Sequence, residues 1–161
     1  MMAGRRAVLV SAGLLLTGCM TAPRQRPAAF WSGRLGLMLQ MEPPQSLQAA
    51  FELQGNAQQG ELTLLGPVGT VLAHLSWNPR QATLERGQQR WTHANVEQLT
   101  EQLVQTPLPI QALFDWIEGR DISPAGWAVD LSAHDVGRIV ARRDAPSPAA
   151  VLRILLDPPT P

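Results

Sequence analysis

The chain has 161 residues, with thirteen arginines, no lysine and thirteen acidic residues, so its formal net charge is zero. The arginines are scattered along the sequence, which leaves no basic stripe for tracking a nucleic-acid backbone. A single cysteine and three widely spaced histidines exclude a disulfide framework and a Cys/His zinc site. The length suits one domain with one hydrophobic core.

The N-terminus has the layout of a secretory signal. Arg5 and Arg6 precede the apolar stretch Ala7–Leu16, which is too short to span a bilayer. The stretch ends in Leu16-Thr17-Gly18-Cys19, which resembles the lipobox of bacterial lipoproteins. This resemblance implies that Cys19 is lipidated and becomes the first residue of the mature protein. The alternative is an ordinary cleaved signal in which Cys19 is incidental.

The resemblance divides the chain into four segments. Residues 1–18 are expected to be the cleaved signal peptide, and 19–29 to be the lipidated cysteine followed by a flexible tether with two prolines. The folded domain is expected over 30–157, with a disordered tail at 158–161. Met20 rather than Asp follows the cysteine, which in lipoproteins of this kind favours the outer membrane, with the domain on its periplasmic face.

Six stretches after the tether are predicted to be β-strands. The first, second and fourth alternate apolar residues with polar or smaller ones at a period of two, the third is short and apolar, and the last two are weaker. In the fourth stretch, for example, Val71, Ala73, Leu75 and Trp77 are expected to share one face of the sheet. Tight turns separate neighbouring stretches, which is typical of an antiparallel meander or barrel. The predicted strands are 35–41, 47–54, 61–65, 71–77, 82–86 and 90–92.

The apolar period then changes to that of two short amphipathic helices, predicted over 95–105 and 109–118. Asn95 and Gln98 have the spacing of a capping pair, and Gly119 suits the end of the second helix. Pro107 ends the first helix and Pro109 suits the first turn of the second. The closing strands are predicted at 127–131, 138–142 and 151–156.

The elements together predict an α+β fold in which a curved antiparallel sheet presents an apolar concave face. The two helices interrupt the strands, so they can either fill that concavity or cover it as a lid. The sequence does not distinguish a filled barrel from a hollow one.

Three motifs resemble the LolB family of outer-membrane lipoproteins. They are Trp31-Ser32-Gly33-Arg34-Leu35, Leu64-Leu65-Gly66-Pro67-Val68-Gly69, and the segment from Pro107 to Gly119 that contains Trp116. The resemblance implies an open, incomplete antiparallel β-barrel (a half-barrel), with short helices as lid or plug over an apolar interior. It also implies that the protein receives lipoproteins from a LolA-like periplasmic carrier.

On this resemblance, apolar strand residues become candidates to line a cavity for acyl chains, and apolar helix residues become candidates for the inner face of a lid. For each of them, plain core packing is an equal alternative. The cavity candidates are Leu35, Leu37, Leu39, Phe51, Leu53, Leu62, Leu64, Leu75 and Trp77. The lid candidates are Leu99, Leu103, Ile110, Leu113, Phe114, Trp116 and Ile117.

The turn Pro67-Val68-Gly69 is a separate candidate, because an apolar residue between Pro and Gly need not pack. In the family the matching residue protrudes, so Val68 is expected to contact lipid or to release cargo, in preference to being a buried loop residue. Arg34 lies on the face opposite the leucines, where it is either a solvated charge or a contact for the carrier.

The expected function is therefore an anchored, monomeric receptor for lipoprotein acyl chains that inserts its cargo among outer-membrane phospholipids. No cofactor, metal or nucleic acid is expected. One alternative is a non-transporting scaffold or pilotin with a filled core. An envelope hydrolase is the weakest hypothesis, because Ser132 and His134 lie in a polar stretch typical of a loop and no nucleophile motif is present.

Overall fold

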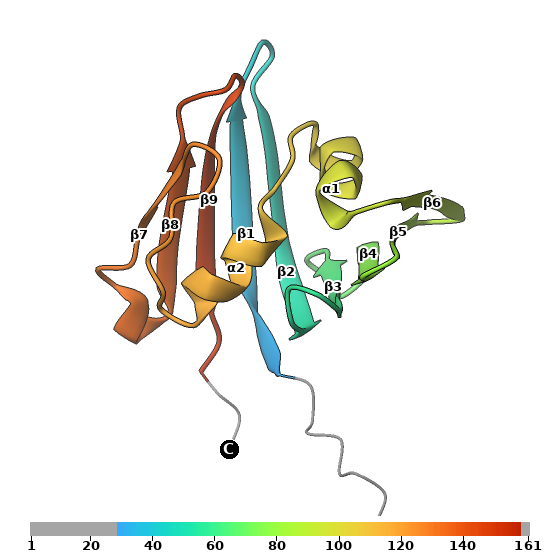
Figure 1. Cartoon of the computed structure of the whole chain (residues 1–161), viewed down its shortest axis with the longest axis horizontal. Coiled ribbons are helices and arrows are strands. Elements are labelled where there is room, and N and C mark those ends of the chain that lie inside the picture. The colour runs from blue at the N-terminus through green and yellow to red at the C-terminus, as the bar shows by residue number, and fades with distance from the viewer. Residues whose placement is uncertain (1–28, 159–161) are drawn as a thin grey trace, which may run out of the picture.

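The structure, a computed structural model, describes residues 29–158 and contains one nine-stranded antiparallel sheet (Figure 1). The strand order is β6-β5-β4-β3-β2-β1-β9-β8-β7. Because the edge strands β6 and β7 do not pair with each other, the sheet forms an open, incomplete barrel, which confirms the predicted fold class. The strands are β1 (Phe30–Gln40), β2 (Gln45–Gly55), β3 (Gly60–Leu65), β4 (Val71–Asn78), β5 (Gln81–Arg86), β6 (Gln89–His93), β7 (Trp127–Asp130), β8 (Arg138–Arg143) and β9 (Ala149–Leu156).

Alternation of side chains explains why these segments pair as they do. Every second residue of a strand points to the same face, so the apolar set of each strand reaches the concave side together. Leu37 of β1, for example, lies opposite Leu47 on β2 and Leu152 on β9. Full burial of a leucine contributes about 1.5–3 kcal/mol, so a register shift of one residue would forfeit many such contributions.

Two short helices, α1 (Val96–Val104) and α2 (Ile110–Ile117), lie between β6 and β7 in the chain. The side chain of Asn95 accepts a hydrogen bond from the backbone N–H of Gln98 at 3.0 Å, as the capping pair predicts. Gly119 follows α2 with a φ of 79°, which suits the left-handed turn that ends many helices. The predicted helix bounds were each about one residue too long.

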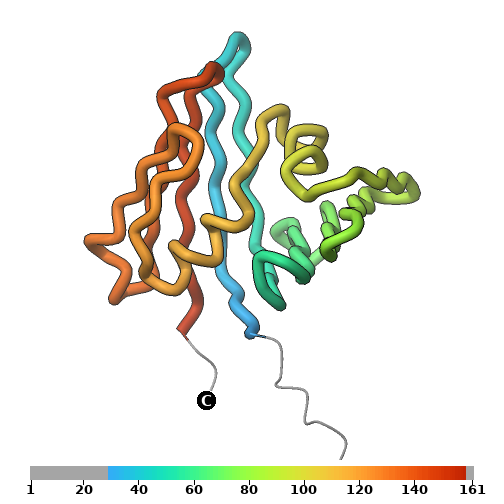
Figure 2. Tube along the Cα trace, viewed as in Figure 1, coloured from blue at the N-terminus to red at the C-terminus, as the bar shows by residue number. Residues whose placement is uncertain are grey.

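Both helices lie on the concave side of the sheet (Figures 1 and 2). The first, α1, packs against β4, β5 and β6, and α2 crosses in front of the central strands. A short 3-10 helix, η1 (His134–Val136), joins β7 to β8 and was not predicted. The hydrophobic core therefore lies between the sheet and the two helices.

One predicted strand face was wrong at its first residue. Leu64 of β3 pairs with Ala73, but the next residue, Leu65, pairs with Val71, so Leu72 is an extra residue in β4. This bulge reverses the direction in which Val71 points. Val71 therefore leaves the inner face shared by Ala73 and Leu75, and its side chain is 60% exposed.

Candidate functional site

An apolar space is enclosed between the concave face of the sheet and the two helices. Its remaining volume is about 40 Å³, which is room for only a few water-sized groups. This part of the interior is therefore nearly filled in this conformation. The lining consists of Leu35, Leu37, Leu47, Phe51, Leu62, Leu64, Leu75, Thr100, Leu103, Val104, Leu108, Pro109, Ile110, Leu113, Trp116, Leu152 and Ile154.

The few polar atoms in this lining already have partners. The Thr100 hydroxyl donates to the carbonyl of Glu97 and accepts from the backbone N–H of Leu108, both at 2.8 Å. The indole N–H of Trp116 donates to the carbonyl of Ile122 at 2.9 Å. The surface of the space is therefore almost entirely hydrocarbon, and a molecule bound there would be stabilised by burial of its apolar surface.

The structure brings most of the predicted cavity and lid residues to this space, and buries the others nearby. The sequence-predicted residues that line it are Leu35, Leu37, Phe51, Leu62, Leu64, Leu75, Leu103, Ile110, Leu113 and Trp116. Leu39, Leu53, Trp77, Leu99, Phe114 and Ile117 belong to the surrounding core without lining it. Burial alone does not assign any of these residues to ligand contact.

Sequence reasoning missed seven lining residues. Leu47, Leu152 and Ile154 belong to strands that were predicted. Leu47 lies between Ser46 and Gln48, a signal that could have identified it, whereas Leu152 and Ile154 share only Arg153 as a polar neighbour. Thr100 and Val104 fall on the inner face of α1. Leu108 and Pro109 lie in the connector between the helices, where no periodicity exists to identify an inner face.

Aromatic side chains hold α2 across the sheet. The ring of Phe114 meets Trp31 of β1 and Trp77 of β4 edge-on, at centroid distances of 5.7 and 6.1 Å. At the end of the helix, Nε2 of His134 lies 2.8 Å from the carbonyl oxygen of Ile117. The helix is therefore attached to the sheet at its middle and to η1 at its end.

The connector between the helices, residues 105–109, is held to both sides of the sheet. The side-chain amide nitrogen of Gln105 donates to the side-chain oxygen of Gln45, at the start of β2, at 3.0 Å. On the other side, Nη2 of Arg143 on β8 donates to the Thr106 hydroxyl at 2.5 Å and to the carbonyl of Pro148 at 2.9 Å. The connector is thus tied to β2 and β8, on either side of the central strands β1 and β9.

Arg143 is an unusual residue that sequence reasoning did not single out. It is only 3% exposed, its guanidinium stacks over the ring of Trp127 at 5.4 Å, and its Nε has no hydrogen-bond partner within the described residues. Burial lowers the pKa of this guanidinium. A buried cation with one hydroxyl and one carbonyl as acceptors is sensitive to the loss of either.

The turn after β3 projects an apolar side chain into solvent. The backbone N–H of Gly69 donates to the carbonyl of Gly66 at 2.9 Å, which places Pro67 and Val68 at the centre of a tight turn. Val68 is 86% exposed, and no other large apolar side chain in residues 29–158 is more exposed. Val71 and Leu72 extend this apolar tip at the start of β4.

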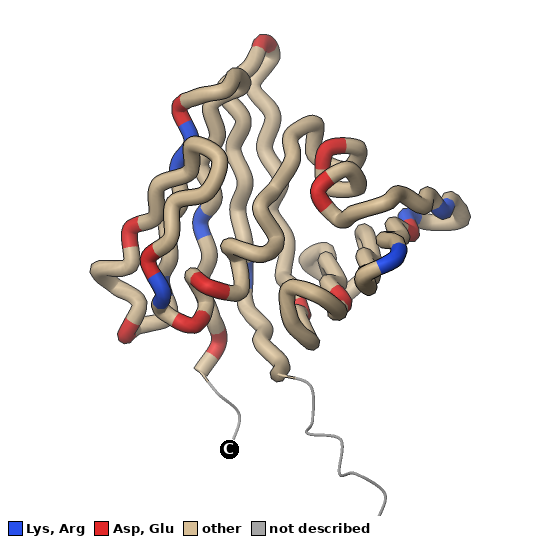
Figure 3. Tube along the Cα trace, viewed as in Figure 1, with Lys and Arg blue, Asp and Glu red and all other residues tan. Residues whose placement is uncertain are grey.

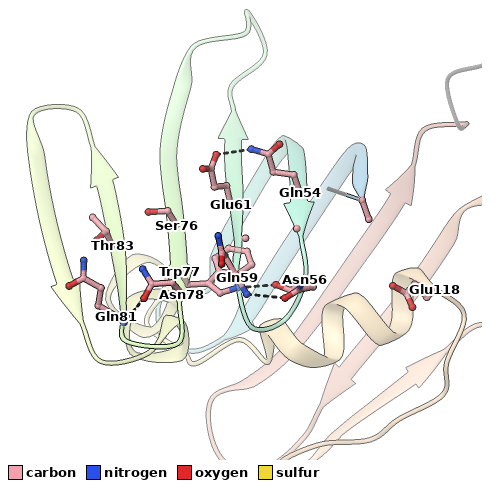
Figure 4. A pocket seen from close by; sticks show the side chains of 13 residues that line it. Gln54, Asn56, Gln59, Glu61, Ser76, Trp77, Asn78, Gln81, Thr83 and Glu118 are labelled. Atoms are coloured by element: carbon pink, nitrogen blue, oxygen red, sulfur yellow. Dashed lines mark hydrogen bonds between the residues drawn. The ribbon is translucent and has the colours of Figure 1, made fainter. Parts of the chain in front are cut away.

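A larger hollow of about 810 Å³ lies at the end of the sheet where β2, β3 and β4 meet, and its lining is mostly polar (Figure 4). Its polar groups largely satisfy one another: Gln54 donates to Glu61 at 2.7 Å, and the Trp77 indole donates to the Asn56 carbonyl at 3.1 Å. It lacks the apolar lining that an acyl chain requires, so the enclosed space is the better candidate site.

Several sequence predictions lie outside the described residues, namely the signal at 1–18, Cys19 with the tether as far as residue 28, and the tail beyond Pro158. Within residues 29–158, no helix is long and apolar enough to cross a bilayer. In the same range, no three His, Cys, Asp or Glu side chains are grouped so that they could hold a metal ion.

Comparison with known proteins gives a consistent result. The family model described as "Outer membrane lipoprotein LolB" matches residues 30–144. The Outer-membrane lipoprotein LolB of Bordetella petrii is 26% identical over 93% of this chain and 92% of its own. The proteins of the same name from Chromobacterium violaceum and Cupriavidus necator are 33% and 28% identical, covering 71% and 73% of this chain and 68% and 72% of theirs.

Proposed function

This chain belongs to the LolB family of outer-membrane lipoproteins, and we propose that it is the receptor that accepts lipoproteins from a periplasmic carrier and inserts them into the outer membrane. The observation that carries the mechanism is the enclosed apolar space under α1 and α2, in which the polar side-chain atoms of Thr100 and Trp116 are already paired. Acyl chains of the cargo bind there.

The physical chemistry of the cargo explains why such a site is needed. Exposing an acyl chain to water costs about 0.8 kcal/mol per CH₂ group, so a lipoprotein with several chains would lose tens of kcal/mol in the aqueous periplasm. The chains must therefore pass from one apolar enclosure to the next. Transfer proceeds without nucleotide if the receptor binds the chains more tightly than the carrier does and less tightly than the bilayer.

Acyl binding requires the helices to move, because the remaining 40 Å³ is far too small for a long hydrocarbon chain. The connector is the part that opens, since two side-chain hydrogen bonds, from Gln105 and Arg143, join it to the sheet. In this mechanism α2 stays attached through Phe114, and α1 and the connector move outward.

The exposed turn at Pro67-Val68-Gly69 acts in release. Transfer of an exposed aliphatic side chain from water into the acyl region of a leaflet lowers the free energy. Val68 therefore brings the loaded domain into contact with the membrane, where the chains leave for the bilayer.

The protein is an outer-membrane lipoprotein by family, and its anchor is assigned to Cys19, with 1–18 removed as the signal. The tether 19–29 keeps the domain, residues 30–157, within reach of the leaflet that receives the cargo. The family membership makes the protein a lipoprotein localisation factor, and we propose that it acts on cargo by binding, without a catalytic step and as a monomer.

A second candidate function is a non-transporting scaffold or pilotin, because the interior is nearly filled. The two functions differ in one property: a scaffold has no reason to admit a hydrocarbon chain.

A fluorescent fatty acid provides the test. Receptor function predicts saturable binding of the fatty acid to the purified protein, and transfer of a lipoprotein from its carrier complex to this protein. A protein that neither binds the fatty acid nor accepts the lipoprotein would refute the proposal and favour the scaffold.

A matched pair of variants localises the binding. Leu75 and Leu84 lie directly opposite each other on β4 and β5, and both are fully buried, but only Leu75 lines the space. Leu75→Phe fills the space and is expected to weaken fatty-acid binding at least tenfold. Leu84→Phe adds the same volume outside the space, so its binding should match that of the unmodified protein.

A further inference from the structure

The convex face of the sheet carries a cluster of arginines. Arg34 of β1, Arg153 of β9, and Arg138 and Arg142 of β8 all point outward, because each alternates with buried residues on its strand. We refer to these four residues as the convex arginine patch. Figure 3 shows basic positions along these three adjacent strands.

The register places the four side chains beside one another. Arg34 and Arg138 both pair with Leu155, from opposite sides of β9, and Arg153 pairs with Gly36 and Val140. Arg153 is therefore the diagonal neighbour of the other three arginines, at a spacing that long side chains bridge. Residues scattered over 120 positions of the sequence thus meet on one surface.

None of these arginines has a carboxylate within ion-pair distance. The ion pairs in the described part of the chain join Arg90 to Glu85, and Arg120 to Asp115 and Glu118. Asp130 on β7 pairs with Val140, which makes it a diagonal neighbour of Arg138 and Arg142. Glu52 on β2 pairs with Ser32 and is a diagonal neighbour of Arg34. Neither carboxylate forms an ion pair with these arginines. Like charges on neighbouring strands destabilise a sheet, so the proximity of the four arginines to one another does not stabilise the fold.

The patch surrounds a hollow rather than a flat surface. A groove of about 810 Å³ is lined by Arg34, Arg138 and Arg153 together with Pro67 and Leu155, among others. At Gly36, between the arginines, an added Cβ would meet open space, so the groove is open to solvent at this position. Leu155 is 45% exposed, which adds an apolar surface beside the cations.

The groove also adjoins the apolar turn. Gly66 and Pro67 form part of its lining, and Val68 follows immediately. Cations next to exposed aliphatic side chains match the surface of a leaflet, where phosphate groups lie just above the acyl chains. A guanidinium also presents a planar fork of N–H groups that matches two phosphate oxygens, a geometry that an ammonium lacks.

We propose that the convex arginine patch binds the phosphodiester headgroups of anionic phospholipids and so orients the domain on the membrane with the Val68 turn inserted. This rests on the proposed function, in which the domain meets a leaflet to release its cargo. The carrier is the less suitable occupant, because it must deliver acyl chains to the helix-covered concave side. The patch lies on the opposite face of the sheet.

The experiment uses the mature chain, residues 19–161, with Cys19→Ala, so that neither the signal segment nor a lipid anchor contributes, and measures its co-flotation with vesicles. Vesicles of phosphatidylcholine are compared with vesicles that also contain phosphatidylglycerol. The proposal predicts stronger binding to the anionic vesicles, weakening as salt is raised. A basic side chain near an anionic leaflet contributes about a fivefold change in binding, so Arg34→Gln, Arg138→Gln and Arg153→Gln together should reduce it about 100-fold.

A control removes the same charge elsewhere: Arg80→Gln, Arg86→Gln and Arg90→Gln on the β4–β6 end of the sheet, all exposed. This control should keep at least a third of the anionic-vesicle binding. Equal binding by the patch variant and the unmodified chain, equal losses in patch and control variants, or no preference for anionic vesicles would each overturn the proposal. A patch variant that binds vesicles normally but fails to accept cargo would assign the patch to the carrier.

Fatty-acid binding separates this proposal from the proposed function. The patch lies outside the enclosed space, so the triple patch variant should bind the fluorescent fatty acid as the unmodified protein does. Failure of the unmodified protein to bind the fatty acid would overturn the acyl-binding function, whereas failure at the vesicle step alone overturns only the headgroup site.

Discussion

The hydrogen bond between Arg143 and Thr106 offers a sharp test of how the helices are held over the sheet. Replacing Thr106 by Val removes the hydroxyl that lies 2.5 Å from Nη2 of Arg143 and keeps nearly the same side-chain volume. Both residues are buried, so water cannot replace the lost acceptor without opening the connector. The carbonyl of Pro148 remains as the other acceptor for that nitrogen.

The magnitude follows from the charge and the burial. A hydrogen bond to a charged group contributes about 1.5–3 kcal/mol, and a buried donor left unpaired incurs a penalty of similar size. Because Val matches Thr in shape, no cavity term is added. We expect Thr106→Val to lower the free energy of unfolding by about 1.5–3 kcal/mol, which corresponds to a Tm decrease of roughly 3–5 °C per kcal/mol for a domain of this size.

Urea unfolding followed by tryptophan fluorescence measures this change, and a double-mutant cycle with Arg143→Met isolates the pair. The coupling free energy should be about 1 kcal/mol or more, because the two residues share one hydrogen bond. Thr92→Val on the exposed face of β6 serves as the control, and its effect should stay within about 0.5 kcal/mol. A coupling below about 0.5 kcal/mol would refute the idea that this bond holds the connector closed.

The same variant tests the opening mechanism. If the hydrogen bond is made only in the closed arrangement, its loss raises the population of the open one by a factor of about 10–100. Fatty-acid uptake by Thr106→Val should then be correspondingly faster in a stopped-flow measurement. Unchanged uptake with reduced stability would show that the connector does not limit entry.

Four further predictions concern the turn, the aromatic contacts, the central strand pair and one carboxylate. Val68→Glu should change the free energy of unfolding by less than about 0.5 kcal/mol, because the side chain is 86% exposed, while cargo insertion into liposomes falls at least tenfold. Val136 on η1 is 63% exposed, and the control variant Val136→Glu should insert cargo normally. Phe114→Leu should lower the free energy of unfolding by about 1–3 kcal/mol, since two edge-on aromatic contacts are lost; a smaller loss in a thermal melt would contradict the role of Phe114 in holding α2. Gly33→Ala should destabilise the β1–β9 pair by about 1–3 kcal/mol, because the added methyl would lie 2.1 Å from the carbonyl oxygen of Leu155. Hydrogen exchange of the β9 amides measures this change, and protection equal to that of the unmodified protein would disprove it. Hydrogen bonds from the Ser132 side chain and backbone lower the pKa of Asp130. This carboxylate therefore favours folding above its unfolded pKa and loses that contribution as the pH falls through its lower folded pKa. Ser132→Ala should raise the pKa of Asp130 in an NMR titration, and an unchanged pKa would rule out the side-chain contribution.

Local patterns in the sequence predicted most of the elements because these elements have one buried and one exposed face. Three strands were identified from alternation and the other six as short runs between turns and loops. Both helices were identified from a period of three to four residues with recognisable ends at Asn95 and Gly119. The antiparallel meander β1–β6 follows from short turns between consecutive strands. The pairing of β1 with β9, by contrast, joins segments more than a hundred residues apart, and no local signal specifies it.

Individual site residues were predictable only in part, for the same reason. Periodicity places Leu75 and Leu84 equally on the inner face, but only the packing of the helices decides that Leu75 lines the remaining space. The direction of Val71 depends on a bulge that arises when β3 and β4 pair. In the sequence, Arg143 resembles its exposed neighbour Arg142, and its burial depends on the connector that folds over it.

The sequence by itself determined the half-barrel fold class, the elements in order, the apolar concave face and the family to which the chain belongs, because each of these depends on local alternation or on short motifs. Only the tertiary structure decided that the interior is nearly filled, that Arg143 holds the connector, and that four arginines from three strands meet on the convex face. These features arise from contacts between residues far apart in the chain, and their geometry exists only once the sheet has assembled.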